Sequence, residues 1–349
     1  MKINFSRIFG LVALGIFGFC STQACHADEQ YHFLKEIHVG GDGGWDYLSI
    51  DADARRLYVT HAAKVVVIDL DKETICGEIT NTVGVHGFAI APKLQRGFAS
   101  NGREGTVSVV DLPTLQTIYK LNAGENPDCI LFEPEHKEVY AFNGRSHSVS
   151  VFDASSGKVA ATIPLSGKPE FAVYDPKTGR IYDNIEDKNE VVVIDPAMHQ
   201  VTATWPIAPG ESASGMAIDA KRHRLFLGCN NNLMLMLNTK DGKVITTVPI
   251  GDGVDANAFD AKTKLAFSSC GDGTLTIAEE ETADKLTVVQ VLKTERGART
   301  MALDPVTHKI YLATAEFEMP PTSDANAKPG RPKVIPGTFK ILVYGLNEN

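Results

Sequence analysis

Short apolar runs that end in an acidic or polar residue recur along this chain at a nearly constant spacing. Four consecutive runs each end in an aspartate, and successive aspartates are 42 residues apart. The four runs are VVVID (65–69), VSVVD (107–111), VSVFD (149–153) and VVVID (191–195). Three later runs continue the series less regularly: MLMLN (234–238), LTIAE (275–279) and ILVYG (341–345). A fixed period of this length indicates a repeat architecture with seven copies.

Within one copy, the alternation of apolar and polar positions predicts four short strands. The third copy shows them as CILFEP (129–134), EVYAF (138–142), VSVFD (149–153) and KVAATIPL (158–165). Clusters of Gly, Pro, Asn, Asp and Ser separate runs that are rich in β-branched and aromatic residues. No segment has a sustained apolar period of about 3.6 residues, so we expect almost no helix. Four-stranded units at this spacing predict an all-β, seven-bladed β-propeller with four-stranded antiparallel blades.

The two ends of the repeat series predict how the ring closes. The last copy stops at its third strand, FKILVYGL (339–346). A counterpart of the missing fourth strand lies near the N-terminus, where HFLKEIHVG (32–40) is similar to fourth strands such as KVITTVPIG (243–251). We therefore expect a single propeller over residues 28–349, in which the N-terminal strand completes the last blade and removes an exposed edge.

The last copy also carries an insertion, at residues 315–338, between its second and third strands. The segment contains five prolines, whereas the corresponding turn in the other copies is only a few residues long. Long loops in compact domains are usually functional or disordered. Two interpretations stay open: a functional cover over the top face, or an insertion that the fold tolerates.

Residues 1–27 have the pattern of a secretory signal peptide. Lys2 and Arg7 give a positive start, an apolar stretch follows over residues 8–19, and small residues allow cleavage after Ala27 or Ala24. The apolar stretch is too short to span a bilayer, and we expect no membrane span in the rest of the chain. The sequence thus predicts an exported protein, periplasmic or secreted, which we expect to be a monomer.

Charge and missing motifs argue against several classes of function. The formal net charge is −9, and phosphate backbones attract basic surfaces, so nucleic-acid binding is not expected. The chain has no CxxCH motif, which argues against covalent haem. It also lacks the GxSxG, HExxH and P-loop motifs, so we predict no catalytic residue and expect a non-enzymatic protein.

Two cysteines leave one structural question open. Cys229 and Cys270 each follow the second strand of neighbouring copies, at aligned positions that differ by one residue. Export permits disulfides. The pair therefore either forms a disulfide or remains two partly buried thiols.

One level of the predicted first strands is polar in every copy. With the copies aligned on the last apolar residue of that strand, the residue four positions upstream lies near the expected channel mouth. These ring residues are Asp46, His86, Asp128, Glu170, Ser214, Asp255 and Arg299. The ring could bind a polar small molecule, and a divalent metal ion such as calcium could be held by Asp46, His86, Asp128, Glu170 and Asp255. The alternative is that the side chains line a solvated channel.

The turns between the second and third strands add polar residues to the same face. His61, Asn101 and Asn143 complete the candidate ligand-binding set, and Asn184, Glu186, Asn230 and Asp272 share the face. Asn and Asp are also favoured in turns, because they tolerate left-handed conformations. Turn chemistry is therefore the alternative interpretation of these residues.

Two strand motifs resemble those of a known family. LYVTH (57–61) followed by VVVID, and IYLAT (310–314) late in the chain, resemble the YVTN-repeat β-propellers, the YncE-like exported proteins. The resemblance covers roughly residues 32–349, and it departs from the family motif at His61, where the motif has Asn. It implies a seven-bladed, exported, mostly non-enzymatic binding protein. Some relatives bind DNA, which the acidity of this chain disfavours.

Two functions from different classes fit these features. The first is a binding or scaffolding propeller that recognises a small molecule or a protein through its top face and channel mouth. The second is a metal-dependent, lactonase-like hydrolase, in which the carboxylate ring would hold a cation that polarises a carbonyl and activates water. The identity of the ligand and the role of the 315–338 insertion stay open.

Overall fold

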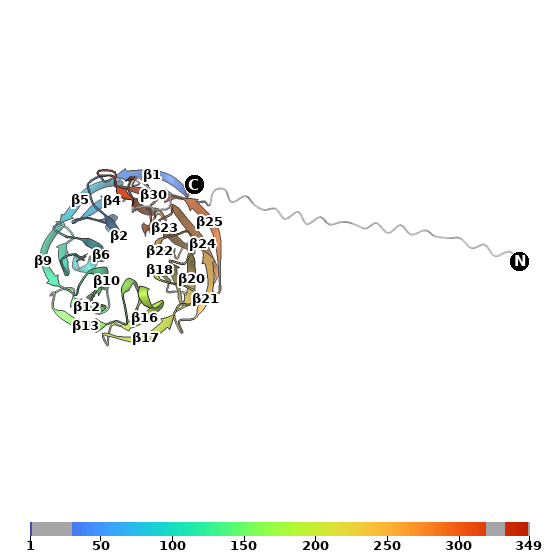
Figure 1. The fold of residues 1–349 in the computed structure, drawn as a ribbon, viewed down its shortest axis with the longest axis horizontal. Coiled ribbons are helices and arrows are strands. Elements are labelled where there is room, and N and C mark those ends of the chain that lie inside the picture. Colours follow the sequence, from blue (N-terminus) through green and yellow to red (C-terminus); the bar gives the residue numbers. More distant parts are fainter. Residues whose placement is uncertain (2–29, 319–331, 348–349) are drawn as a thin grey trace, which may run out of the picture.

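In the computed structural model, which describes residue 1 and residues 30–318 and 332–347, seven four-stranded antiparallel sheets form a ring (Figure 1). This confirms the predicted propeller. Most of residues 1–27, the predicted signal peptide, lies outside the described residues, as do residues 319–331 of the insertion. Within the described residues, helix is limited to two 3-10 turns, η2 (Pro92–Leu94) and η3 (Glu186–Lys188).

Each blade runs from an inner strand at the channel to an outer strand at the rim. Blade 1 comprises β2 (Trp45–Asp51), β3 (Arg56–His61), β4 (Lys64–Asp69) and β5 (Thr74–Thr80). Blade 2 comprises β6 (Val85–Ala91), β7 (Arg96–Asn101), β8 (Thr106–Asp111) and β9 (Gln116–Asn122). Blade 3 comprises β10 (Pro127–Glu133), β11 (Glu138–Asn143), β12 (Ser148–Asp153) and β13 (Val159–Pro164). Blade 4 comprises β14 (Pro169–Asp175), β15 (Arg180–Ile185), β16 (Glu190–Asp195) and β17 (Gln200–Pro206).

The remaining blades follow the same order. Blade 5 comprises β18 (Ala213–Asp219), β19 (Arg224–Cys229), β20 (Leu233–Asn238) and β21 (Val244–Pro249). Blade 6 comprises β22 (Val254–Asp260), β23 (Leu265–Cys270), β24 (Thr274–Thr282) and β25 (Lys285–Lys293). Blade 7 comprises β26 (Thr300–Leu303), β27 (Ile310–Thr314), β30 (Lys340–Gly345) and β1 (His32–His38).

The N-terminal strand closes the ring as expected. β1 pairs antiparallel with β30, with His32 opposite Gly345 and Ile37 opposite Ile341, and the two strands lie side by side at the rim (Figure 1). The side-chain amide of Gln290 on blade 6 also bonds to both main-chain groups of Tyr31 (3.0 and 2.7 Å). Both ends of the chain therefore share blade 7, and opening the ring requires breaking this pairing.

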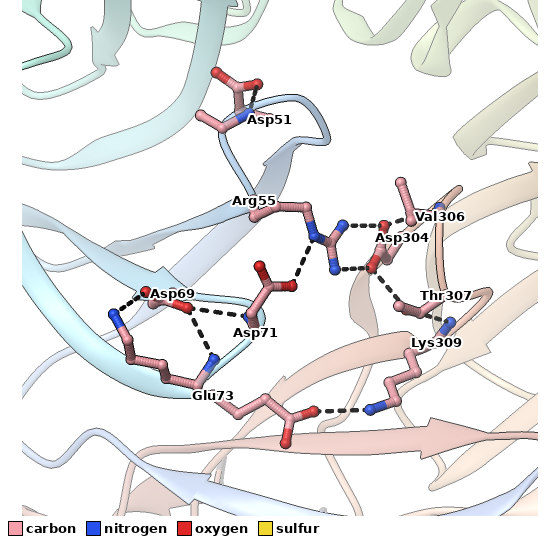
Figure 2. A network of polar contacts seen from close by, with 11 residues as sticks. Asp51, Arg55, Asp69, Asp71, Glu73, Asp304, Val306, Thr307 and Lys309 are labelled. Carbon is pink, nitrogen blue, oxygen red and sulfur yellow. Dashed lines mark hydrogen bonds and ion pairs between the residues drawn. The ribbon is translucent and has the colours of Figure 1, made fainter. Parts of the chain in front are cut away.

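A buried ion pair joins blade 7 to blade 1 across the closure (Figure 2). The guanidinium of Arg55 donates two hydrogen bonds to the carboxylate of Asp304, at 2.9 and 2.8 Å, and Nε of Arg55 contacts Asp71 at 2.9 Å. The Asp304 side chain is completely buried. Nearby, Lys309 of blade 7 contacts Glu73 of blade 1 at 3.0 Å. We call these four blade-spanning residues, Arg55, Asp304, Lys309 and Glu73, the closure seam.

Apolar layers between neighbouring blades form the core. One continuous cluster contains Leu57 and Val59 of blade 1 together with Tyr311 and Ile341 of blade 7. Stacked aromatic pairs span other blade interfaces, such as Tyr58 with Phe88, whose ring centroids lie 4.6 Å apart. Successive side chains of a strand point to opposite faces of the blade. Apolar residues at consecutive positions of the second and third strands therefore pack against both neighbouring blades.

Two sequence-based alternatives concern segments away from the channel. Cys229 and Cys270 are free and buried in different core clusters, so the structure has two thiols and no disulfide between them. The described ends of the insertion form a small ladder between β28 (Phe317–Glu318) and β29 (Lys333–Val334). Phe317 packs on Trp45 with ring centroids 6.2 Å apart, which anchors the base of the insertion beside blade 1.

Candidate functional site

The inner strands of six blades are irregular at the level of the polar ring. Each of β2, β6, β10, β14, β18 and β22 has a register shift against its neighbour, and the shift skips the ring residue. In blade 7 the strand begins only after Arg299. A bulge leaves a residue unpaired and re-aims its side chain. An unpaired position of this kind suits a polar side chain, which accounts for the polar residues at this level in the six bulged strands.

Donors from the preceding blade hold the main chain at this level. Ser100 Oγ donates to the carbonyl of Asp128 at 2.5 Å, and Asn184 Nδ2 donates to the carbonyl of Ser214 at 2.9 Å. Ser269 Oγ makes the same contact with the carbonyl of Arg299. These bonds satisfy buried carbonyls that the bulged ladder leaves unpaired. They fix the ring residues relative to the neighbouring blade.

The structure brings five ring residues to one cavity of about 110 Å³ at the channel mouth. Its charged lining residues are Asp46, Asp128, Glu170, Asp255 and Arg299. Blades 1, 3, 4, 6 and 7 thus contribute charged groups to a single small space. The two remaining ring residues contact this set, since His86 lies beside Asp46 and Ser214 donates to Asp255 at 3.4 Å.

Three ring residues from adjacent blades converge more closely than the others. His86 Nδ1 lies 2.6 Å from Asp46 Oδ2 and 3.5 Å from Asp128 Oδ1. One ligand atom from each of the three residues lies within 4.8 Å of the others. We call Asp46, His86 and Asp128 the channel triad. Two carboxylate oxygens and one imidazole nitrogen at this separation can bind a single divalent cation.

The carboxylates on the other wall have basic partners of their own. Lys168 Nζ lies 2.8 Å from Glu170 Oε2, and Arg299 Nε lies 3.3 Å from Asp255 Oδ2. Among the described residues, neither Asp46 nor Asp128 has a lysine or arginine nitrogen within 4 Å. Among the described residues, His86 is therefore the only basic side chain in contact with these two carboxylates, and Lys168 acts on Asp128 only at longer range. This difference separates the triad from the rest of the ring.

Burial and crowding of charges shift the pKa values in the cavity. Burial raises the pKa of Asp128, and the charge of Asp46 adds to this effect while His86 opposes it. Burial alone would lower the pKa of His86, but its bond to Asp46 and the charge of Asp128 outweigh it, so that pKa is raised. Burial also raises the pKa of Asp255 to about 7, against the charge of Arg299. Because a metal ion binds the deprotonated forms of these groups, cation binding at the triad is expected to release protons.

An aromatic floor closes the cavity below the ring. Tyr47 on β2 reaches across the channel, donates its hydroxyl to the carbonyl of Glu170 on blade 4 at 2.6 Å, and packs on Phe171 with centroids 5.2 Å apart. At the position where Ser100 and Asn184 supply a donor, blade 3 has Phe142. Tyr47 therefore supplies the bond that blade 3 cannot make.

The contacts that Tyr47, Phe171 and Lys168 make at the cavity were not predicted from the sequence. A signal existed for the first two residues: the position after the ring residue is aromatic in copies 1 and 4, but small in the other five. Lys168 had no such signal, because its importance comes only from its contacts with Glu170 and Glu186, the latter at 2.5 Å.

Replacing Tyr47 with phenylalanine is expected to lower the free energy of unfolding by about 1–2 kcal/mol, because it leaves the Glu170 carbonyl without its donor. Urea denaturation measures the change. Tyr119→Phe is the matched control, since Tyr119 is 37% exposed on an outer strand, and a shift within about 0.5 kcal/mol is expected there. Equal effects of the two substitutions would show that the Tyr47 hydroxyl does not hold blade 4.

The three candidate turn residues do not reach the cavity. His61 is 1% exposed and stacks on Phe339, with ring centroids 4.3 Å apart. Asn101 is fully buried and donates to the hydroxyls of Thr106 and Ser108. Asn143 bonds Ser148 and Ser150 in the same way. All three side chains are buried at strand ends and do not line the cavity, so a ligand-binding role for them stays a prediction.

Comparisons with known proteins support the fold. No model of a known protein family matches the sequence, and no curated protein matches it. Among solved structures, the chain is similar to one described as Kuenenia stuttgartiensis hydrazine synthase. The TM-score is 0.70 at 18% sequence identity, over 80% of this chain and 96% of that one. At this identity the likeness concerns the fold alone, and the YVTN-repeat resemblance stays a prediction. Within the described residues, no helix has the length and hydropathy that a membrane crossing requires.

Proposed function

We propose that this protein is a binding propeller whose channel mouth holds a divalent cation through the channel triad. The observation that carries the proposal is the close approach of three ligand atoms, two of them from carboxylates without a lysine or arginine partner among the described residues. The triad also adjoins a small cavity, so a bound ion would remain accessible from the top face. The ring is thus assigned to ligand binding and not only to a solvated channel lining.

The ligand atoms favour a transition metal over calcium. Calcium takes six to eight oxygen ligands, whereas imidazole suits zinc, iron, copper and nickel. With Glu170 and Asp255 engaged by Lys168 and Arg299, two carboxylates and His86 remain. Three protein ligands leave at least one coordination position open, as in zinc sites that bind a water or a substrate.

Replacing Asp128 with asparagine is expected to weaken zinc or manganese binding by at least about tenfold, because it removes a charged ligand. Calorimetric titration of protein purified without chelator, together with elemental analysis, measures the affinity. Asp255→Asn is the matched control: it removes a carboxylate from the same cavity that Arg299 already engages, and a change below about threefold is expected. Absence of bound metal in the wild-type protein, or equal loss in both variants, would refute the proposal.

The hydrolase alternative keeps one supporting observation, the open cavity beside a three-ligand site. A cation there could lower the pKa of a bound water and polarise a carbonyl. The metal-loaded protein from the same titration separates the two functions when it is assayed with simple lactones. Binding without hydrolysis favours the binding propeller, and hydrolysis that the Asp128→Asn variant loses favours the enzyme.

We also propose that the protein acts outside the cytoplasm. The support is the signal-peptide pattern of residues 1–27 together with the resemblance to exported YVTN-repeat propellers. The net charge of −9 continues to argue against nucleic acid as a partner.

A further inference from the structure

One basic side chain stands in a cavity whose other charged groups are acidic. Arg299 lines the channel-mouth cavity together with Asp46, Asp128, Glu170 and Asp255. It also lines a wider depression of about 450 Å³ over blades 6 and 7, which includes Arg296, Asp252 and Asp272. We infer that the site binds a small chelating oxyanion, a carboxylate or phosphate compound, as a complex with the cation, with Arg299 contacting the anion. This inference rests on the proposed cation site.

The charges of the cavity set the order of binding. Without a cation, four carboxyl groups surround the space, and the basic side chains that contact these groups among the described residues are Lys168, His86 and Arg299. An anion entering this space meets unfavourable like charges. A divalent ion at the channel triad adds two positive charges and offers open coordination positions that oxygen anions fill. The oxyanion should therefore bind only after the cation.

The geometry of Arg299 suits contact with an anion. Its Nε faces Asp255 Oδ2 at 3.3 Å, longer than the usual range for a charged hydrogen bond, and its side chain is 55% exposed. A guanidinium presents five donors in a planar fork that matches a carboxylate or phosphate. Arg299 occupies the ring position of blade 7 and lines the cavity, and blade 7 lies across the ring from blades 3 and 4 (Figure 1).

The sizes of the two spaces limit the ligand. The ring cavity, at about 110 Å³, is much smaller than the depression of about 450 Å³, so only the chelating group of a ligand is expected at the ring. The rest of a ligand would extend past Arg299 into the larger depression. Small di- and tricarboxylates and phosphate compounds have this shape, with one chelating group and a polar remainder.

Calorimetric titrations of the full chain, with and without zinc, test the inference with three probes: oxalate, citrate and inorganic phosphate. We expect at least one probe to bind the zinc-loaded protein and none to bind the metal-free protein. Arg299→Gln should weaken that binding by about tenfold or more and change zinc affinity by less than about threefold. Arg299→Lys keeps the charge but loses the planar fork, so its affinity for the oxyanion should lie between those of the wild type and Arg299→Gln.

Arg145→Gln is the matched control, because Arg145 is exposed in a turn of blade 3 and does not line the cavity. It should leave the affinity for the oxyanion unchanged. Zinc binding without any oxyanion binding, an oxyanion that binds equally to the metal-free protein, or an unchanged Arg299→Gln variant would each overturn this inference alone. Failure of the wild-type protein to bind zinc or manganese would overturn both proposals. The probe that binds tells whether the class is carboxylate or phosphate.

Discussion

Replacing Arg55 with methionine is expected to lower the free energy of unfolding by about 3–5 kcal/mol, because it leaves the buried Asp304 carboxylate without its counter-ion. The Arg55–Asp304 pair joins blade 7 to blade 1 (Figure 2), and the two ends of the described chain pair with each other within blade 7. Urea denaturation followed by fluorescence measures the change. This loss in the free energy of unfolding exceeds that expected for an unpaired surface charge, because water does not solvate the buried carboxylate of Asp304.

Arg96→Met is the matched control for this experiment. Arg96 pairs with Asp111 inside blade 2, at 3.2 Å, and both side chains are about one-third exposed, so a loss below about 1 kcal/mol is expected. The double variant Arg55→Met/Asp304→Asn should recover part of the stability, since it removes the unpaired charge and keeps an oxygen for the Val306 amide. Similar losses in Arg55→Met and Arg96→Met would contradict a structural role for the closure seam.

The same pair predicts how stability depends on acid. Burial alone would raise the pKa of Asp304, but the bonds from Arg55 and Thr307 outweigh it and lower that pKa. A lowered folded-state pKa contributes stability above the unfolded value of about 3.9, and that contribution is lost as the pH falls below it. The destabilisation caused by Arg55→Met should therefore shrink in acid, which the same urea titrations at pH 3 and pH 7 measure.

Replacing Asp183 with valine is expected to raise the free energy of unfolding by at least about 2 kcal/mol at pH 7. Asp183 lies on β15, where the aligned residues of other copies are Val59, Ala99, Ala141, Leu227, Ser268 and Leu312. Its side chain is fully buried, and neither carboxylate oxygen makes a hydrogen bond of good geometry among the described residues, although the main chain of Glu170 approaches it. Burial, and secondly the charge of Glu170, raise the pKa of Asp183 well above its usual value.

The direction of the pH dependence follows from this shift. The folded protein keeps a proton on Asp183 that the unfolded chain releases above about pH 4, so the wild type loses stability as the pH rises toward the raised pKa. The advantage of Asp183→Val should therefore grow by up to about 1.4 kcal/mol per pH unit above pH 4. Asp183→Asn keeps a buried polar group but cannot ionise. It therefore separates the cost of burying a polar group from the cost of retaining the proton. A constant difference between wild type and Asp183→Asn from pH 4 to 8 would show that Asp183 does not titrate in this way.

A buried acid of this kind suggests a link between stability and function. Besides burial, the charge of Glu170 raises the pKa of Asp183, and Glu170 lines the channel-mouth cavity. Strongly shifted pKa values cluster at functional sites, although structural networks also produce them. Asp183 lowers the free energy of unfolding, which is consistent with a fold that keeps acidic groups near its channel although they destabilise the core.

The sequence by itself determined the architecture. Each copy has to bury the apolar faces of four short strands, and it can do so only against neighbouring copies. The period of the repeat is therefore sufficient to predict the fold. The similarity of HFLKEIHVG to the other fourth strands was enough to predict the pairing of β1 with β30. The level of the polar ring could also be located, because the aligned position of the first strand is polar in every copy.

Only the tertiary structure decided which ring residues differ from the rest. Asp46 and Glu170 are equivalent in the repeat, yet Lys168 engages Glu170, whereas His86 from the next blade contacts Asp46. Tyr47 and Glu170 belong to copies on opposite sides of the channel and meet only because the ring is narrow. The repeat specifies the local strand conformation of every copy, but contacts across the channel depend on distances between blades, which no single copy encodes.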